Sequence, residues 1–429
     1  MRLIRTRDKS FPSFLSNVAG RGEADTAKVE ASVRKILGDV KRNGDKAVEK
    51  YTRRFDGVAL NGLFEVGASA LNSALKRLKK DEIRLLEGAA LRIEDYHRRS
   101  LQRSWTYRDP YGSTLGIKVT PLERAGIYVP GGKAAYPSTV LMNAVPARVA
   151  GVAEVVMATP PSKNGINPYV LAAAKVAGVG RIFRVGGAQA VGALAYGTET
   201  VPKVDKITGP GNIYVATAKR LVYGAVDIDM IAGPSEILII NDGGGDPAWI
   251  ASDLLSQAEH DELASSILIT TSVKTAKAVR KEVERQMKGL KRRSIAEASI
   301  RNYGAVIVAG DLLEAAGISN RIAPEHLELF VQKPLPLLRH IRNAGAVFLG
   351  RNTPEAVGDY IAGPNHTLPT GGTARFSSPL GVEDFIKRSS VIGFSRAGVQ
   401  ALGKNASRLA RIEGLDAHAK SVEKRLKGA

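Results

Sequence analysis

The sequence contains no cysteine among its 429 residues. This absence excludes disulfides, thiolate metal ligands and a cysteine nucleophile, so any metal must be held by His, Asp, Glu, Asn, Gln or water. Long apolar runs are also missing, since no stretch approaches the ~18 consecutive apolar residues of a membrane-spanning helix. The basic N-terminal segment has no apolar core of a secretory signal. We therefore expect a cytoplasmic protein with no membrane partner.

Acidic residues are few relative to basic ones: 42 Asp and Glu stand against 62 Lys and Arg, a formal net charge of +20. This balance favours anionic partners, including nucleic acid. The basic residues are dispersed among acidic ones, as in KEVERQMKGLKRR, and form no basic tail or aromatic-interleaved basic strip. We interpret the charge as a solvated surface and do not expect nucleic acid as a partner. A nucleic-acid-binding protein is the alternative, and salt-sensitive binding to DNA or RNA without turnover would favour it.

The first hundred residues have apolar positions at helical spacing. The pattern predicts a helix over residues 27–56 that breaks at Gly44 and Asp45, and one long helix over residues 73–101. His97 is placed on the polar side of the second helix and is interpreted as a surface residue. The tail after about Val382 is basic and is predicted to be helical.

From Gly116 onward, apolar strand patterns and helical patterns alternate at short spacing. This alternation predicts an α/β fold with a parallel sheet and helices on its faces. Four Gly-rich stretches, VPGG, VGGAQA, GPGN and AGPSE, follow predicted strands. Ligands of such sheets bind beyond the carboxyl ends of the strands. A second α/β section follows, and its first helix is predicted to start with Asp246 as N-cap and Pro247 at the first position.

Gln257 and His260 lie three residues apart in LLSQAEHDE and therefore share one face of a predicted helix. The spacing suits a metal, although glutamine is a rare ligand and the segment also fits a helix that turns from core to solvent. Asp359 stands in a Gly-rich loop, where a carboxylate is either a turn former or a ligand.

Glu325 and His326 are adjacent after Pro324. They converge on a substrate if they lie in a loop, whereas on a strand they point to opposite faces and fit a salt-bridge partner and a packed ring. Glu413 and His418 lie five apart on a predicted helix, which by itself is weak evidence. The Gly-rich turns suggest phosphate binding through backbone N–H groups, but no complete G-x-G-x-x-G is present. The residues alone thus indicate an α/β enzyme that uses a nucleotide, with a His/carboxylate metal site left open.

Seven stretches together resemble the histidinol dehydrogenase family, in the order of that family and over nearly the whole chain. They are ERAGIYVPGG, RVGGAQAVGALAYGTETVPKVDKITGPGNIYVATAKR, DMIAGPSEILII, DLLSQAEHD, RIAPEHLEL, GDYIAGPNHTLPT and EGLDAHAKSV. The resemblance implies a zinc enzyme of histidine biosynthesis that oxidises L-histidinol to L-histidine through L-histidinal, with two NAD⁺ consumed.

The resemblance also implies roles for individual residues. Glu325 and His326 are the expected acid/base pair. One Zn²⁺ per subunit is expected on Gln257, His260, Asp359 and His418. Histidinol is expected to contact these same four residues together with Ser235, His326 and Glu413. Tyr128, Gln189 and Asn212 are expected on the NAD side.

The resemblance further implies a homodimer in which the C-terminal segment crosses to the partner, so that Glu413 and His418 complete the other subunit's site. We expect two Rossmann-like α/β domains with parallel sheets, a helical N-terminal segment and a helical C-terminal dimerisation tail. The expected boundaries are an N-terminal arm at 1–25, a first domain at 26–127 together with 236–380, a second domain at 128–235 and the tail at 381–429.

Because the chain has no cysteine, the second oxidation cannot pass through a thioester and must use a hydrated aldehyde. Glu325 is the expected group for that water, and His326 is the expected base for hydroxyl protons, since an imidazole titrates near neutral pH. A dehydrogenase for another polar alcohol is the alternative within the same scaffold. Glu413 favours histidinol, because a carboxylate suits the substrate's amino group and not an anionic alcohol.

Overall fold

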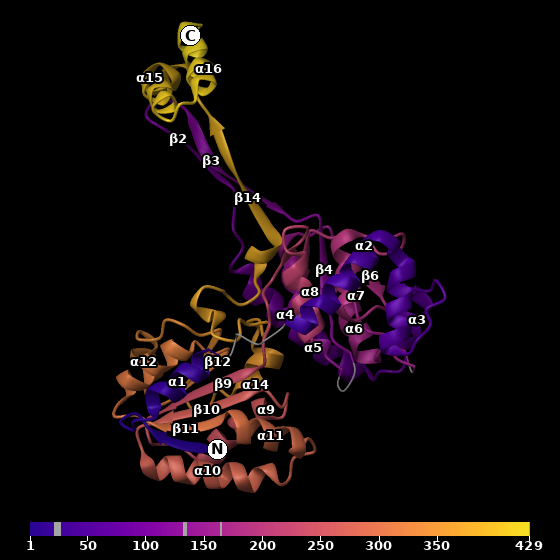
Figure 1. The fold of residues 1–429 in the computed structure, drawn as a ribbon, viewed down its shortest axis with the longest axis vertical. Coiled ribbons are helices and arrows are strands. Elements are labelled where there is room, and N and C mark those ends of the chain that lie inside the picture. Colours follow the sequence, from indigo (N-terminus) through magenta and orange to yellow (C-terminus); the bar gives the residue numbers. More distant parts are fainter. Residues whose placement is uncertain (21–26, 132–134, 164, 429) are drawn as a thin grey trace.

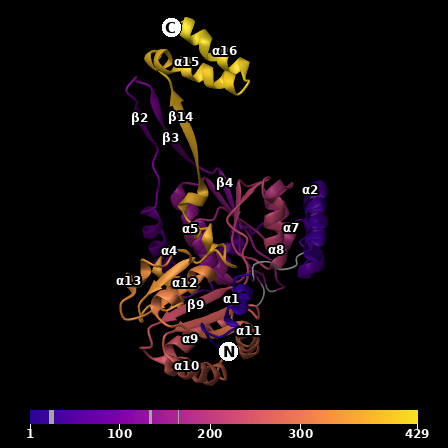
Figure 2. The ribbon, with the colours of Figure 1, turned by 60° about the vertical axis from the view of Figure 1, so that its left-hand side comes forward.

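The computed structural model describes residues 1–20, 27–131, 135–163 and 165–428. Two parallel sheets with packed helices form the body, and an antiparallel sheet carries an arm that extends away from it (Figures 1 and 2). The predicted α/β class with parallel sheets is confirmed. The expected boundary at residues 25 and 26 lies outside the described residues. Within the described ranges, no helix is long and apolar enough to cross a membrane.

One sheet has five parallel strands in the order β6-β5-β4-β7-β8. Successive side chains of β5 enter different cores: Val156 and Ala158 join the cluster under α2 and α7, whereas Val155 and Met157 join the cluster under α5 and α6. Both faces of this sheet are therefore buried, as is usual for parallel sheets. Its strands are β4 (Arg124–Tyr128), β5 (Glu154–Ala158), β6 (Arg181–Phe183), β7 (Lys206–Thr208) and β8 (Asp227–Ile228), and its helices are α5 (Pro137–Ala150), α6 (Pro168–Ala177), α7 (Gly187–Tyr196) and α8 (Ile213–Val222).

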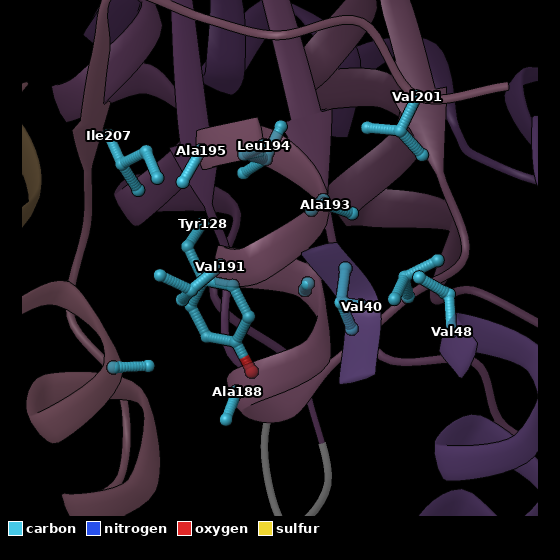
Figure 3. Close-up of a cluster of buried hydrophobic side chains, with 14 of the residues drawn as sticks. Val40, Val48, Tyr128, Ala188, Val191, Ala193, Leu194, Ala195, Val201 and Ile207 are labelled. Atoms are coloured by element: carbon cyan, nitrogen blue, oxygen red, sulfur yellow. The ribbon is translucent and has the colours of Figure 1, made fainter. Parts of the chain in front are cut away.

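Helix α2 (Ala27–Asp56) bends at Gly44, whose φ of 49° is a left-handed conformation, as the sequence predicted. It packs on α7 and α8, which lie within residues 128–235. The domain boundaries expected from the sequence instead grouped residues 26–127 with 236–380. Figure 3 shows this core, in which Val40 and Val48 from α2 face Val191 and Leu194 from α7.

The single helix predicted for residues 73–101 is in fact two helices, α3 (Ala68–Leu75) and α4 (Lys80–Arg98). The second begins afresh because the Glu82 side chain accepts a hydrogen bond of 2.8 Å from the Lys79 N–H. The prediction that His97 is a surface residue is wrong, since only 2% of it is exposed. It lies one helical turn after Ile93 and therefore extends the buried face of α4.

The other parallel sheet has six strands in the order β1-β11-β10-β9-β12-β13. Asp246 caps α9 as predicted, accepting a hydrogen bond of 2.8 Å from the Ala248 N–H. The strands are β1 (Arg2–Arg5), β9 (Glu236–Asn241), β10 (Ser265–Thr270), β11 (Gly304–Val308), β12 (His326–Phe330) and β13 (Ala346–Leu349). The helices are α1 (Phe11–Ala19), α9 (Pro247–Ala258), α10 (Val273–Met287), α11 (Arg293–Tyr303), α12 (Leu312–Ile322), α13 (Pro334–Leu338) and α14 (Glu355–Val357).

The arm consists of β2 (Trp105–Arg108), β3 (Thr114–Pro121) and β14 (Ile386–Gly393), followed by α15 (Arg396–Ile412) and α16 (Asp416–Lys427). The tail was predicted to be helical from about Val382. It does begin with a 3-10 helix at Val382–Phe385, but strand β14 follows and separates this helix from α15. Strand β14 pairs antiparallel with β3 along its whole length, which supplies the backbone partners that keep it extended. In both views the arm holds the C-terminus far from the N-terminal strand (Figures 1 and 2).

Candidate active site

Three of the predicted site residues lie at the amino ends of two neighbouring strands in the six-stranded sheet. Strands β9 and β12 are neighbours, with His326 opposite Ile237. Ser235 directly precedes β9, and Glu325 directly precedes β12. All three residues therefore lie at the amino ends of these strands. Ligands of parallel sheets usually bind beyond the carboxyl ends of the strands, so this centre departs from the expected location.

The His326 imidazole is buried, with 3% of the residue exposed, and its two nitrogens have different partners. Nδ1 lies 3.0 Å from the Glu236 carbonyl oxygen, which can only accept, so Nδ1 carries the hydrogen and donates it. Nε2 makes no hydrogen bond to the described residues and lies 3.5 Å from Asp359 Oδ1. Nε2 is therefore the nitrogen whose lone pair accepts a proton when the ring is neutral, as a general base requires.

Burial lowers the pKa of His326, but the carboxylates of Glu355, Glu325 and Asp359 outweigh burial and raise the pKa well above its usual value. For Glu325, the effect of burial on the pKa outweighs the effects of the neighbouring groups. Burial raises the pKa of Glu325 to about 8, although the His326 imidazole and a hydrogen bond of 2.8 Å from the Glu236 N–H act against it. The pKa values of both adjacent groups are thus displaced upward, and displaced pKa values of this kind are common among groups that transfer protons.

Gln257 lies at the end of α9, and its Nε2 is 3.4 Å from His326 Nδ1. With the amide turned so that both ends are satisfied, Gln257 donates to Glu355 Oε1 at 2.7 Å and accepts from the Glu236 N–H at 3.0 Å. Ligand atoms of His326, Glu355 and Asp359 lie within 4.8 Å of one another. Gln257 and Asp359, both predicted metal ligands, therefore share one buried space around His326.

Two further histidines surround the same carboxylate. His366 Nδ1 lies 2.9 Å from the Asp359 backbone oxygen, and burial lowers its pKa. His260 follows α9, and burial also lowers its pKa, whereas the nearby Asp359 acts to raise it. Burial raises the pKa of Asp359, but His326, His366 and His260 outweigh it and hold the pKa below its usual value. An ionised Asp359 carboxylate beside His260 and His366, the imidazoles whose pKa burial lowers, is a set of donors that suits Zn²⁺.

The sequence interpretation missed three buried acids behind His326. Glu355 and Glu328 are almost fully buried, and the Glu355 N–H donates to Glu328 Oε1 at 2.8 Å. Burial raises the pKa of Glu355 to about 7 and that of Asp253 to about 6. The signal in the sequence was an acid within the apolar strand HLELF, which costs free energy unless it has a partner.

Glu413 and His418 do not join this centre within the chain. Glu413 follows α15, His418 lies on α16, and both are exposed near the end of the arm. In both views α16 is remote from α9 (Figures 1 and 2), and Figure 1 shows that it is also remote from α14. A second chain is required if these two residues are to reach a site of this kind.

The three residues predicted for the NAD side line one cavity of about 1230 Å³. This exceeds the ~300–1,000 Å³ of common ligand pockets. Tyr128 ends β4, Gln189 lies in the first turn of α7, and Asn212 caps α8. The cavity thus lies at carboxyl ends of the five-stranded sheet and at two helix N-termini, where phosphates are favoured.

Inside this cavity several polar groups are available. The Tyr128 hydroxyl accepts a hydrogen bond of 3.1 Å from the Gly187 N–H, and burial raises the pKa of Tyr128 to about 12, so the hydroxyl keeps its proton. Gln189 is buried, and its Oε1 has no partner among the described residues. Lys35 and Arg54 also line the cavity and favour an anionic occupant.

Comparison with known proteins agrees with these features. The family model for histidinol dehydrogenase matches residues 19–426. The histidinol dehydrogenase of Syntrophotalea carbinolica is 58% identical over 428 residues, covering 100% of this chain and 99% of that relative. That of Geobacter metallireducens is 59% identical over 430 residues, covering 100% and 99%. The crystal structure of histidinol dehydrogenase from Elizabethkingia anophelis superposes with a TM-score of 0.94 at 36% identity, covering 100% and 98%.

The fold and the matches define a dehydrogenase of the α/β class. More narrowly, the chain belongs to the histidinol dehydrogenase family. The predicted family and the predicted kind of enzyme are confirmed.

Proposed function

We propose that this enzyme oxidises L-histidinol to L-histidine through L-histidinal, the last two steps of histidine biosynthesis, with two NAD⁺ reduced and one Zn²⁺ per subunit. The observation that carries the proposal is the meeting of Glu325, His326, Gln257 and Asp359 at the amino ends of β9 and β12. An amide, an imidazole and two carboxyl groups then surround one space, in a chain whose separate cavity suits a dinucleotide.

The first oxidation requires a base for the alcohol proton while hydride leaves the carbinol carbon for the nicotinamide. His326 Nε2 serves as that base, because Nδ1 is committed to the Glu236 carbonyl oxygen. Each proton taken up must later leave the imidazole. The acids around His326 stabilise its protonated form during the step.

The second oxidation requires water, because no cysteine is present to form a thioester. Glu325 in its ionised form removes a proton from water as the oxygen bonds to the aldehyde carbon, and the protonated His326 gives its proton to the former carbonyl oxygen, which yields the hydrated aldehyde. His326 then takes a hydroxyl proton as the second hydride leaves, and the carboxylic acid forms. Ser235, at the start of β9, is proposed to contact the substrate beside these two residues.

Zinc is proposed to bind Gln257, His260 and Asp359, with His418 from the partner chain as the fourth ligand. The donor set fits the metal, since it offers imidazole nitrogens and oxygens without thiolates. When bound, zinc would supply a Lewis-acid anchor for the amino and imidazole nitrogens of histidinol. Glu355 holds the Gln257 amide through the 2.7 Å hydrogen bond and thereby orients its oxygen.

We also propose a homodimer with shared sites. The arm extends from the body and carries exposed apolar side chains, including Ile392, Leu409 and Ile412. Exposed apolar surface of this kind is typical of an interface. In the dimer the partner's arm would bring Glu413 to the substrate amine and His418 to the metal.

The test combines purified protein, Zn²⁺, L-histidinol and NAD⁺ and follows NADH by absorbance. We expect two NADH per histidine formed, and chelation should stop the reaction until zinc is restored. One NADH per substrate, or full activity in chelator, would contradict the proposal. Substitution D359N should lower the zinc content per subunit measured by elemental analysis. The control D242N, which removes a carboxylate that pairs with Arg351 at the other end of β9, should keep the metal.

A further inference from the structure

A buried ion pair lies beneath the cavity that the proposed function assigns to NAD⁺. Lys219 on α8 is 1% exposed, and its ammonium group contacts the carboxylate of Asp229, which follows β8 and has a fully buried side chain. Both partners also hold the same backbone unit. Lys219 Nζ donates to the Gly209 carbonyl oxygen at 2.9 Å, and Asp229 Oδ2 accepts from the Gly209 N–H at 2.8 Å.

Gly209 cannot be replaced by another residue without strain. Its φ of +107° lies in the region that favours glycine, and a Cβ here would come within 2.1 Å of the Tyr128 carbonyl oxygen. The turn that starts at Gly209 is therefore pressed against the end of β4. Tyr128 itself lines the cavity, so the position of this turn and the position of the Tyr128 backbone depend on each other.

The turn leads directly into the cavity. Asn212 follows Gly209 by three residues and caps α8, accepting hydrogen bonds from the Tyr214 N–H at 3.0 Å and the Val215 N–H at 3.2 Å. Asn212 and Tyr214 both line the cavity. The turn that leads into the N-terminus of α8 thus starts at a residue whose N–H and C=O are both hydrogen-bonded to the buried ion pair.

A buried ion pair is a poor source of net stability, because desolvation of two charges offsets most of their attraction. Its value lies in fixing geometry, since each charge must meet particular partners. We propose that Lys219 and Asp229 are positioning residues that hold the Gly209 turn and so place Asn212 and the α8 N-terminus for NAD⁺. This inference rests on the proposed function, which assigns the cavity to NAD⁺.

The test is the double variant K219M/D229N, which removes both charges without leaving one buried charge unpaired. The Michaelis constant for NAD⁺ should rise by about tenfold, the lower end of the effect of removing a group that orients a binding residue. The value of kcat at saturating NAD⁺ and the KM for histidinol should both stay within about twofold, since the pair touches neither the base nor the alcohol site.

The matched control is K206M. Lys206 is a buried lysine on β7, and its ammonium group pairs with Asp227 and Asp384 rather than with Asp229. It should lower the melting temperature without a selective change in the KM for NAD⁺. If the double variant does not fold, K219Q/D229N gives the same measurement, because it also removes both charges and its glutamine is one bond shorter than the lysine that donates to the Gly209 carbonyl oxygen.

The outcomes separate the inference from the proposed function. A folded K219M/D229N or K219Q/D229N variant whose KM for NAD⁺ stays within about twofold of wild type overturns the positioning role. Equal changes in kcat and in both Michaelis constants also overturn it, since they indicate a general loss of structure. The variant N212A tests the cavity itself: an unchanged KM for NAD⁺ there would instead refute the assignment of the cavity to NAD⁺.

Discussion

Nε2 of His326 lies 3.5 Å from Oδ1 of Asp359, so the proposed base and a proposed metal ligand share one buried space. This proximity links acid/base chemistry to substrate anchoring. Substitution H326N should therefore slow both oxidations, because both need a base for a hydroxyl proton. The measurement is single-turnover NADH formation from histidinol and, separately, from histidinal. Zinc content is the control, and it should be unchanged, since the proposed metal ligands remain. A variant that slows only one step would contradict this role.

The variant E325Q should slow the oxidation of histidinal far more than that of histidinol. Glutamine keeps the size of the side chain but cannot take a proton from water, and only the second step uses water. A fall of about 10²-fold or more in the rate with histidinal is expected for loss of a general base. Because burial raises the pKa of Glu325 to about 8, the wild-type rate of this step should increase as the pH rises toward 8 and the carboxyl ionises. Equal slowing of both steps would refute the assignment.

Mixed dimers test whether the sites are shared. The variants H418A and E325Q are unfolded, mixed and refolded together. If Glu413 and His418 act in the partner's site, each heterodimer then has one complete site. Random pairing should then restore about a quarter of wild-type activity, since half of the dimers carry one of two sites intact. The control pair is E325Q with H326N, which leaves one defect in each of the two sites of the heterodimer and should restore nothing. Inactive H418A/E325Q mixtures would indicate sites contained in single chains.

His97 should make stability depend on pH. Burial lowers the pKa of His97 to about 4, and neither ring nitrogen has a partner among the described residues. The unfolded chain therefore binds a proton that the folded chain excludes, so stability is complete above about pH 6.5 and decreases as the pH falls toward 4. The full effect is ~3 kcal/mol. Urea denaturation at pH 7 and pH 5 should show a smaller loss for H97L than for wild type. The exposed His340 provides the control H340Q, which should behave as wild type.

The core between α7 and the five-stranded sheet should depend on Leu194, which is fully buried (Figure 3) and packs against Gly126 of β4. Substitution L194A should destabilise the protein by about 2–5 kcal/mol, through lost burial and the cavity that remains. The control L85A removes a leucine of α4 that is 66% exposed, and it should change the free energy of unfolding by no more than about 0.5 kcal/mol. Similar effects of both substitutions on urea unfolding would contradict this description of the core.

Local patterns predicted much of the fold correctly. The alternation after Gly116 predicted parallel sheets, Asp246 was identified as an N-cap, and the break at Gly44 was placed correctly. These features depend on residues near one another in the chain. His97 and strand β14 were predicted wrongly, because the burial of His97 depends on distant helices and the extended form of β14 depends on pairing with β3, more than 250 residues earlier in the chain.

The sequence alone determined the family, the α/β class and the candidate residues, because these are carried by residue identity and by short-range spacing. Only the tertiary structure decided that β9 and β12 are neighbours, which brings Ser235, Glu325 and His326 to amino ends of strands. It also decided that Lys219 and Asp229 meet at Gly209, and that His418 is carried away on an arm. Strand order and helix packing arise from burial summed over the whole chain, so no single segment encodes them.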